Sequence, residues 1–395
     1  MANVLLNALA STAGGGLTYL QNVLPRLGQS NGGHQYYVLA PPEQLESYGR
    51  FANQHLMIET KAASGGTLAR IWWEQTGLRN FIKARQIDVL VSLGNFALFA
   101  SPVPQLLFNR NALYFSPYFK NDLWRRRCYR DLLSHEVKSC LAKLSISQAR
   151  ANVTPTAAFA RAIQAAGFSH KEFSVIPFGF DLISFTANSE PLPETQLAQL
   201  NHRADCLRIL CVSHYNYFRN FETLLRALPI IKREVQARAG KTVQLVLTTD
   251  LQCGAVYGGY DATLAAELIE RLGVRADIAM LGSVPYDKLH QLYRLCDACV
   301  CPSYAESFGH TLLEAMALGV PVVAADLPVH REICTEAAVY FEVFNEQALA
   351  TQCARVLTEQ PLLETLREQG LRRRQEFSWD EHCRQLADLI RRCIV

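Results

Sequence analysis

The sequence predicts an α/β protein with two Rossmann-like domains that face each other across a cleft. The length of 395 residues suits two domains of roughly 150–200 residues each. Short apolar runs rich in β-branched residues alternate with longer segments of helical period along the whole chain. This alternation is typical of βαβ units and parallel sheets. The hydrophobic content of 49% and charged content of 19% indicate a folded globular chain.

The expected elements follow in order. In the first half, a helix is expected at 17–27, and strands at 4–9, 36–39, 87–93, 104–108, 141–146 and 173–176. A polar stretch with two prolines, 184–204, has the composition of a linker or surface excursion. A second set of strands is expected at 207–213, 242–248, 276–281, 298–301 and 320–324, with helices between them. The predicted domains are therefore 1–182 and 206–376, with a linker at 183–205 and a terminal helix at 377–395.

Charge and cysteine usage exclude several classes of protein. The net charge is +3, so no strong field points to nucleic acid, although residues 1–182 carry +8 and residues 183–395 carry −5. The 12 cysteines are scattered, and no two CxxC motifs pair with each other, which indicates a reducing compartment. No basic segment precedes the first apolar run, and no long uncharged apolar segment follows. We therefore expect a cytoplasmic protein without a signal peptide.

The segment 301–333 carries the most informative chemistry. It reads as a strand end, a loop, a helix at about 309–318, a Gly-Val-Pro turn and another strand. Glu306 lies in the loop and Glu314 in the helix, with seven residues between them. The helix start at 307–310 suits a diphosphate, and Gly309 lets the backbone approach a ligand closely. The two carboxylates could accept hydrogen bonds from sugar and ribose hydroxyls, whereas a lone Glu314 would be no more than a solvated helix residue.

This segment resembles the E-x7-E region of the retaining GT-B glycosyltransferases often grouped as family 4. That pattern runs PS-x-x-E-x-FG-x-x-x-x-EA-x-A-x-G-x-PV, and every fixed position is met. The matching residues are Pro302, Ser303, Glu306, Phe308, Gly309, Glu314, Ala315, Ala317, Gly319, Pro321 and Val322. The resemblance implies that Glu306 binds the donor sugar and Glu314 the nucleotide ribose. It also implies that the backbone of Ser307, Phe308, Gly309, His310 and Thr311 binds the phosphates.

Other matches extend the resemblance to a GT-B fold over nearly the whole chain. Arg219-Asn220 falls where the family usually has Lys-Gly or Lys-Asn facing the diphosphate. An arginine can hydrogen-bond two phosphate oxygens at once. His214 stands where the family commonly has an arginine, and a structural histidine is an equal alternative there. Ser283, in the segment LGSV, matches the region that lies beside the base of the donor in the family. Residues 377–390 resemble the terminal helix that returns to the first domain.

The first domain matches more loosely. Gly14, Gly15 and Gly16 lie in a loop between the first strand and first helix, where related enzymes carry a glycine-rich loop near the donor and acceptor. A flexible turn is the alternative interpretation. Near position 109 the family often has a histidine, whereas this chain has Asn109 and Asn111. Either could hydrogen-bond a sugar on the acceptor side, but neither can act as a general base.

No metal and no cofactor are expected beyond a nucleotide-sugar co-substrate. The chain contains no DxD triplet to hold a divalent ion on the diphosphate, so the positive charge must come from Arg219, helix ends and His214. A run near 124–130 contains Arg125, Arg126, Arg127 and Arg130 beside two aromatic residues. It could rest on an anionic membrane that bears a lipid-linked acceptor, or it could be a solvated helix face.

The expected activity is retaining transfer of a hexosyl-type sugar to a hydroxyl of a glycan, a glycolipid or a lipid-linked saccharide. In a front-face reaction Arg219 and Glu306 are the predicted catalytic residues, and the departing phosphate takes the acceptor proton. A GT-B nucleotide-sugar epimerase is the main alternative and would act without an acceptor. A phosphorylase would need a pyridoxal phosphate lysine that is not marked here, and a dehydrogenase would need different glycine spacing.

Overall fold

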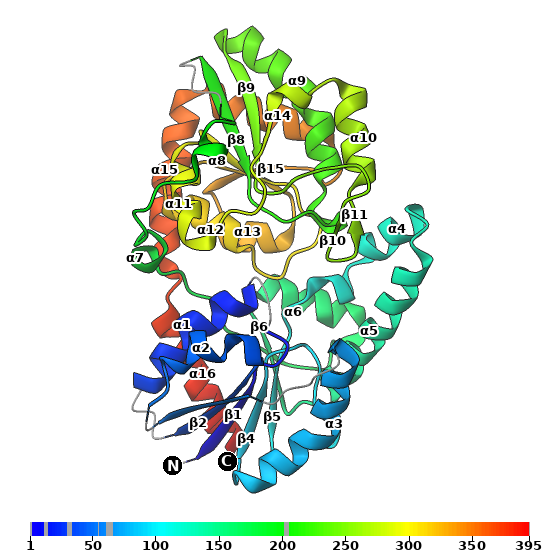
Figure 1. Ribbon diagram of the computed structural model, residues 1–395, viewed down its shortest axis with the longest axis vertical. Coiled ribbons are helices and arrows are strands. Elements are labelled where there is room, and N and C mark those ends of the chain that lie inside the picture. Colours follow the sequence, from blue (N-terminus) through cyan, green and yellow to red (C-terminus); the bar gives the residue numbers. More distant parts are fainter. Residues whose placement is uncertain are drawn as a thin grey trace. The chain divides into compact units, whose positions relative to one another are not determined.

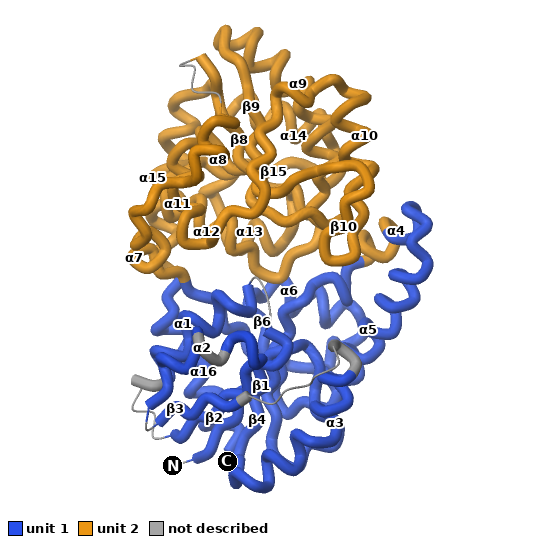
Figure 2. Tube along the Cα trace, in the orientation of Figure 1, with its two compact units in different colours: residues 1–116, 123–179, 377–395 blue, residues 117–122, 180–376 orange. Residues whose placement is uncertain are grey.

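The computed structural model describes residues 2–11, 15–29, 34–53, 55–60, 66–200 and 205–394. The chain forms two compact units (Figure 2). Unit 1 comprises residues 1–116, 123–179 and 377–395, and unit 2 comprises residues 117–122 and 180–376. Each unit contains one parallel sheet flanked by helices (Figure 1), which confirms the predicted α/β class with two Rossmann-like domains.

Unit 1 is built on a seven-stranded sheet of order β3-β2-β1-β4-β5-β6-β7. Its strands are β1 (Asn3–Asn7), β2 (Gln35–Ala40), β3 (Leu56–Thr60), β4 (Val89–Ser92), β5 (Gln105–Phe108), β6 (Ala151–Thr154) and β7 (Phe173–Val175). Every pairing is parallel. The strand order reverses between β1 and β4, which makes their carboxyl ends the switch point of this sheet.

The helices of unit 1 fill the crossovers between these strands. They are α1 (Gly15–Gln29), α2 (Leu45–Gly49), α3 (Gly66–Ala84), α5 (Tyr129–Gln148), α6 (Ala157–Ile163) and α16 (Trp379–Ile394), with short turns η1 (Pro42–Gln44), η2 (Ala112–Phe115) and η3 (Gln164–Phe168). α5 corrects the sequence analysis, because 141–146 was expected to be a strand. Ala142, Ser145 and Ile146 are buried at helical spacing within α5, so the short apolar run belongs to a longer helix.

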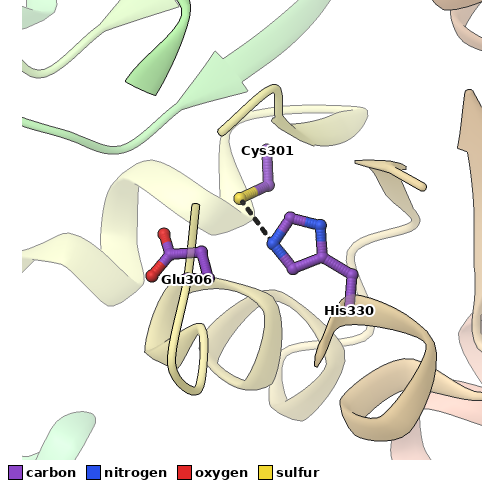
Figure 3. Close-up of side chains that lie close together, drawn as sticks. All are labelled: Cys301, Glu306 and His330. Carbon is purple, nitrogen blue, oxygen red and sulfur yellow. Dashed lines mark hydrogen bonds between the residues drawn. The ribbon is translucent and has the colours of Figure 1, made fainter. Parts of the chain in front are cut away.

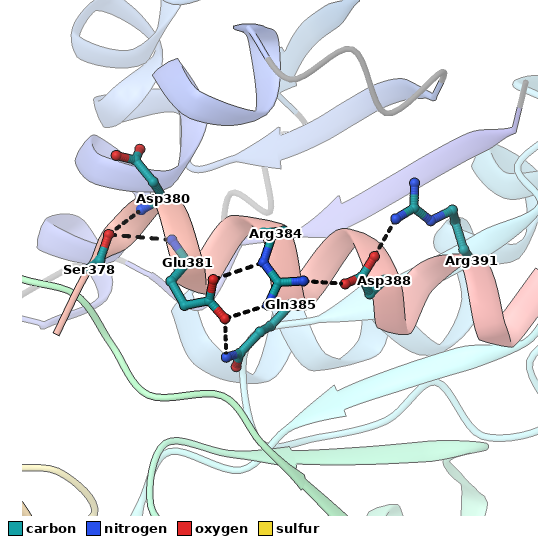
Figure 4. Close-up of polar contacts among 7 residues, drawn as sticks. All are labelled: Ser378, Asp380, Glu381, Arg384, Gln385, Asp388 and Arg391. Carbon is teal, nitrogen blue, oxygen red and sulfur yellow. Dashed lines mark hydrogen bonds and ion pairs between the residues drawn. The ribbon is translucent and has the colours of Figure 1, made fainter. Parts of the chain in front are cut away.

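The terminal helix α16 belongs to unit 1, as the resemblance implied. Its apolar residues, among them Trp379, Leu386 and Ile390, are buried. Its outer face carries a chain of ion pairs and hydrogen bonds (Figure 4). Arg384 joins Glu381 at 2.6 Å and Asp388 at 3.0 Å. Hydrogen bonds from Arg384, and then Gln385, hold the pKa of Glu381 at about 2. These charges keep the exposed face polar.

Unit 2 is built on a six-stranded parallel sheet of order β12-β9-β8-β13-β14-β15. Its strands are β8 (Cys206–Cys211), β9 (Thr242–Leu247), β12 (Ile278–Met280), β13 (Ala298–Cys301), β14 (Val322–Ala325) and β15 (Ala338–Phe341), and a small hairpin joins β10 (Val256–Tyr257) to β11 (Tyr260–Asp261). The order reverses between β8 and β13, which are direct neighbours. Their carboxyl ends are the switch point of unit 2.

The helices of unit 2 separate these strands along the chain. They are α7 (Leu182–Phe185), α8 (Glu194–Leu197), α9 (Phe221–Ala239), α10 (Thr263–Leu272), α11 (Leu289–Arg294), α12 (His310–Ala317), α13 (Pro328–Cys334), α14 (Glu346–Thr358) and α15 (Gln360–Arg373), with turns η4 (Tyr217–Arg219), η5 (Arg275–Asp277), η6 (Tyr286–Lys288) and η7 (Arg374–Glu376). Among the described helices, none is long and apolar enough to cross a membrane.

The compact units differ from the predicted domain limits in two places. Residues 117–122, at the start of α4 (Pro117–Arg125), pack with unit 2. The hydroxyl of Tyr304 donates to Asp122 at 2.7 Å, and the Tyr118 ring lies against Phe344. The expected linker also packs on unit 2, because the Gln196 side chain donates to the Leu281 carbonyl at 2.9 Å. Aromatic packing and side-chain hydrogen bonds therefore attach both segments to unit 2.

Candidate functional site

The switch point of unit 2 brings together the two loops singled out in the sequence. The loop after β8 leads through η4 to α9, and the loop after β13 leads to α12. Parallel neighbouring strands present their carboxyl ends at one edge, so these loops meet although they are far apart in the sequence. Tyr304 N donates to the Phe218 carbonyl at 2.9 Å, which ties one loop to the other.

Arg219 is fixed at this edge by the turn that carries it. The Asn216 side chain accepts a hydrogen bond from Arg219 N at 3.2 Å and caps η4. Asn220 then adopts a left-handed conformation, with φ 56°, and its side-chain amide donates to the Pro302 carbonyl at 3.1 Å. Asparagine is one of the few non-glycine residues that tolerate this conformation. The Arg219–Asn220 pair therefore sets both the turn and its contact with the second loop.

The guanidinium of Arg219 forms an ion pair with Glu306. It also donates to the Ser303 hydroxyl at 3.3 Å and lies over the Phe218 ring at 4.9 Å. The side chains of Arg219 and Glu306 are only 25% and 11% exposed. Burial weakens solvent screening, so this pair is held more tightly than a surface ion pair. The structure thus brings together the two residues predicted to be catalytic.

A thiol and an imidazole lie beside Glu306 (Figure 3). Cys301, at the end of β13, and His330, in α13, are buried, and their Sγ and Nε2 atoms are 3.8 Å apart. His330 Nδ1 is 2.7 Å from the Ala325 carbonyl, so Nδ1 carries a proton and donates it there. In the neutral ring, Nε2 can therefore accept from the Cys301 thiol.

The charges of this pair are coupled. Burial by itself would raise the pKa of the Cys301 thiol, but the neighbouring His330 lowers it below its ordinary value. Burial would also lower the pKa of His330, but Cys301 and then Glu306 raise it. Cys301, Glu306 and His330 offer ligand atoms within 4.8 Å of one another, a donor set that could hold a metal ion. No short sequence motif contains these three residues, so the sequence alone did not indicate this group.

The start of α12 lies directly after Glu306. Gly309 is the N-cap, with φ 96°, and no side chain caps this end of the helix. A Cβ at Gly309 would lie 2.9 Å from Leu312 Cδ1, so glycine is needed for both space and conformation. Ser303 and Phe308 are buried, whereas Ser307, His310 and Thr311 are partly exposed. The expected roles of Ser307 to Thr311 toward phosphate stay predictions.

Glu314 is buried inside the unit and only 3% exposed. The Tyr293 hydroxyl donates to its carboxylate at 2.9 Å, and Tyr286 also hydrogen-bonds it. Burial raises the pKa of Glu314 to about 7, although both tyrosine hydrogen bonds act in the opposite direction. The carboxyl is thus already held by protein hydroxyls, a feature that the sequence did not reveal. Its role toward a ribose stays a prediction.

The remaining donor-side residues of unit 2 lie on exposed turns. His214, after β8, is exposed, and the Ser213 hydroxyl donates to its carbonyl at 2.7 Å. Ser283 is exposed in the turn after the edge strand β12, next to Gly282 with φ 68°. Both lie at the carboxyl edge of the sheet, but the structure shows no contact from either side chain to Arg219 or Glu306 in the part of the chain that it describes.

In unit 1 the glycine loop follows β1 at the switch point of that sheet. Gly14 lies outside the described residues, whereas Gly15 and Gly16 begin α1. A Cβ at Gly16 would lie 3.1 Å from Ser11 Cα, and one at Gly94, after β4, would lie 2.8 Å from Ala10 Cβ. These close approaches explain Gly16 and Gly94 structurally, and a contact of the glycine loop with a ligand stays a prediction.

Asn109 and Asn111 follow β5 in unit 1. Asn109 is buried, and its amide lies 3.3 Å from Asn152 Oδ1. The Asn111 side chain accepts from Leu113 N at 3.0 Å and caps η2. Both asparagines therefore have structural partners. Between them, Arg110 donates to the Gly15 carbonyl at 2.9 Å and lies 4.8 Å from the Tyr19 ring, a cation that the sequence analysis missed.

Comparison with known proteins agrees with this architecture. Residues 13–183 match the family model described as "Glycosyltransferase Family 4", and residues 194–373 match "Glycosyl transferases group 1". The O-antigen chain mannosyltransferase B of Escherichia coli is 29% identical over 165 residues, 42% of this chain and 40% of the relative. The D-inositol 3-phosphate glycosyltransferase of Salinispora arenicola is 32% identical over 166 residues, 40% of this chain and 35% of the relative.

Solved structures match over nearly the whole chain. Sucrose-phosphate synthase from Thermosynechococcus elongatus has a TM-score of 0.73 and 17% identity, with 99% of each chain covered. HepE from Anabaena, in complex with UDP and glucose, has a TM-score of 0.69 and 19% identity, with 99% and 100% covered. The curated relatives are matched over less than half of their own length.

The fold and the two family matches together define the class. The chain is a GT-B glycosyltransferase similar to those of family 4, which confirms this part of the resemblance seen in the sequence.

Proposed function

We propose that the chain transfers a hexosyl-type sugar from a nucleotide-diphosphate sugar to an acceptor hydroxyl, with retention at the anomeric carbon. The observation that carries the proposal is the Arg219–Glu306 pair at the switch point of unit 2. A cation suits the diphosphate, and a carboxylate suits sugar hydroxyls. HepE, which shares the fold, binds UDP and glucose, so a nucleotide-sugar donor is consistent with this architecture.

Arg219 is well suited to the leaving group. Its Nε atom is buried and has no acceptor within the described part of the chain, so a phosphate oxygen could satisfy it after a small side-chain movement. The start of α12, beside Glu306, adds backbone N–H groups and the positive end of a helix dipole. Charge that develops on the departing phosphate would therefore be stabilised from two sides.

The proposed reaction is a front-face displacement. The bond between the anomeric carbon and the β-phosphate oxygen breaks, and the acceptor hydroxyl forms the new bond on the same face. Its proton passes to the departing phosphate oxygen, so that a nucleoside diphosphate leaves. Glu306, neutralised by Arg219, would accept hydrogen bonds from the sugar and orient it. No base from the protein is required for this route.

We also propose that this transfer needs no metal and no cofactor. Glu306 already has a cationic partner in Arg219, and Cys301 and His330 are paired with each other. A metal ion at this group would have to displace both contacts. The acceptor class proposed here is a saccharide, a glycolipid or a lipid-linked saccharide, because O-antigen chain mannosyltransferase B is among the relatives.

A thermal-shift screen against UDP-, GDP-, ADP- and dTDP-sugars tests the proposal. A ligand that binds the folded state must raise the unfolding midpoint. We expect one nucleotide class to stabilise the protein and to release its diphosphate only when an acceptor is added. Donor turnover without any acceptor would instead favour an epimerase, and no stabilisation by any of the four classes would contradict the proposal.

A further inference from the structure

Helix α5 in unit 1 buries its more polar face and exposes its apolar face, whereas an ordinary amphipathic surface helix does the reverse. Its buried positions are mostly polar or small, namely His135, Ser139, Ala142, Ser145 and Ile146. The two serines are satisfied locally, since Ser139 Oγ donates to the Tyr114 carbonyl at 2.6 Å and Ser145 Oγ to the Leu141 carbonyl at 2.7 Å. The inward face therefore contributes little apolar burial.

The opposite face of α5 is apolar and open to solvent. Tyr129, Leu133, Val137 and Leu144 are 54%, 69%, 53% and 50% exposed, and Cys140 is exposed as well. Successive members are four, four, three and four residues apart, the spacing that places side chains on one face of a helix. We call these five residues the outer stripe of α5.

A stripe of this kind differs from single exposed apolar residues. Scattered exposed leucines are normal on protein surfaces, whereas contiguous apolar faces mark interaction sites. The outer stripe runs along most of α5, which is labelled in Figure 1. At its amino-terminal end, the exposed Trp124 packs edge-on against Tyr129 with ring centroids 5.5 Å apart. Both rings have an apolar body and a polar atom, which suits a membrane interface.

The charge of this region distinguishes between two possible partners of the outer stripe, a second copy of the chain and a membrane. Between Arg125 and Gln148 the chain carries six basic residues against two acidic ones. A second copy of α5 packed along the stripe would bring one basic surface against another, a repulsive arrangement. A bilayer with acidic headgroups offers the opposite charge and an apolar layer at the same place.

We propose that the outer stripe of α5 inserts into the headgroup boundary of an anionic membrane, with Arg125 and Arg130 against acidic lipids. The helix would lie in the plane of the interface without crossing the bilayer. This surface and its binding do not depend on the proposed transfer reaction, because no residue of the donor site takes part in it.

Co-sedimentation of the full chain with vesicles tests the proposal. The protein should bind vesicles that contain phosphatidylglycerol, and bind poorly to phosphatidylcholine alone. The double substitution Leu133→Gln with Val137→Gln should lower the partition coefficient by about tenfold or more, because it removes apolar surface from the contact. Arg125→Gln or Arg130→Gln should each lower it about fivefold, and added salt should weaken binding of the wild type.

Leu264→Gln is the matched control, since Leu264 is an exposed leucine on α10 of unit 2. It should leave vesicle binding unchanged. All these positions are at the surface, so the variants should fold, and circular dichroism checks this. Failure of the wild type to bind acidic vesicles, or full binding by the Leu133/Val137 variant, would overturn the proposal. A dimer in sedimentation velocity that the same double substitution dissociates would overturn it in favour of a second copy.

Discussion

Arg219 and Glu306 are 87 residues apart in the sequence, and the fold holds them in direct contact. Each side chain is mostly buried, so each depends on the other for its charge to be tolerated. Removing the arginine would leave a carboxylate with one partner fewer and would remove a cation from the proposed phosphate site. Arg219 therefore has a larger expected effect than any arginine on the surface of unit 2.

For Arg219→Ala, we expect kcat/KM for sugar transfer to fall because the activation free energy rises by about 2–4 kcal/mol. This is the size of the effect when one such hydrogen-bond donor is lost. Steady-state kinetics at saturating acceptor would measure this. Arg238→Ala is the control, because Arg238 is a surface residue of α9 that pairs with Glu234. A fully active Arg219→Ala enzyme would remove the arginine from the mechanism.

The buried carboxyl of Glu314 predicts how the stability of the folded chain depends on pH. The pKa of this carboxyl is about 7 in the folded chain against an ordinary value of 4.5, because burial disfavours its charged form. A raised pKa means that the folded state holds its proton more tightly than the unfolded state. The stabilising contribution is therefore fully present below pH 4.5 and is lost as the pH rises through about 7.

Glu314→Gln cannot lose a proton, so it should escape this loss. We expect the unfolding free energy of the wild type to fall by about 2–3 kcal/mol relative to the variant between pH 5 and pH 7.5. Urea unfolding of both proteins at the two pH values would measure the difference. A constant difference would show that Glu314 is ionised throughout this range.

The sequence predicted the individual members of the site better than their surroundings. Glu306, Gly309 and Glu314 stand in one local pattern, and Arg219 stands in a second, so each could be found by its spacing. Tyr293 hydrogen-bonds Glu314, and His330 lies near Glu306, but both come from other helices and no local spacing marks them. The capping role of Asn111 and the burial of Asn109 likewise depend on packing that a linear sequence does not display.

At the scale of elements, the two sheets place their loops by strand order. In each sheet the order reverses beside the first strand, so the loops after β1 and β4, and those after β8 and β13, are neighbours within their own unit. Five of the six strands in the parallel sheet of unit 2 were predicted because they are short, buried apolar runs, whereas β15 was not predicted. The 141–146 run failed because a short apolar window cannot distinguish a strand from part of a long helix.

The contact between Gly179 and α16 gives a prediction at this scale. A Cβ at Gly179 would lie 2.1 Å from Trp379 N, which is backbone and cannot rotate away. We expect Gly179→Ala to lower the stability of unit 1 by about 1–3 kcal/mol, since overpacking forces the backbone to shift. Differential scanning calorimetry would show a lower midpoint for this unit.

Gly49→Ala is the matched control for that change. Gly49 ends α2, and a Cβ there would have nothing within 4 Å. Its midpoint should stay close to that of the wild type. If Gly179→Ala were equally harmless, the close approach of this glycine to the start of α16 would be of no energetic consequence.

For the whole molecule, the composition predicted the correct fold class, but it did not predict where the basic and the apolar surface residues lie. The sequence alone gave no function to the +8 charge of the first 182 residues. In the structure, Arg125 and Arg130 of this basic half lie next to the outer stripe of α5. The missing signal was the helical character of α5, because a helix of the full 129–148 length would have revealed the stripe.

The proposed metal independence can be tested on the whole molecule. We expect exhaustive treatment with a chelator to leave the transfer rate unchanged, because Arg219 and the start of α12 supply the positive charge at the proposed phosphate site. The measurement is the initial rate before and after dialysis against the chelator, with and without added Mg²⁺ or Zn²⁺. A rate that collapses and is restored by one ion would instead assign a role to the Cys301, Glu306 and His330 donor set.

We propose that unit 2 holds the activated sugar at the carboxyl ends of β8 and β13. A crystal structure with the stabilising nucleotide-sugar bound would show where the donor lies. We expect the diphosphate against the Arg219 guanidinium and the first turn of α12, with Glu306 hydrogen-bonded to the sugar. A diphosphate bound elsewhere, with the Arg219–Glu306 pair intact and distant from it, would overturn this proposal.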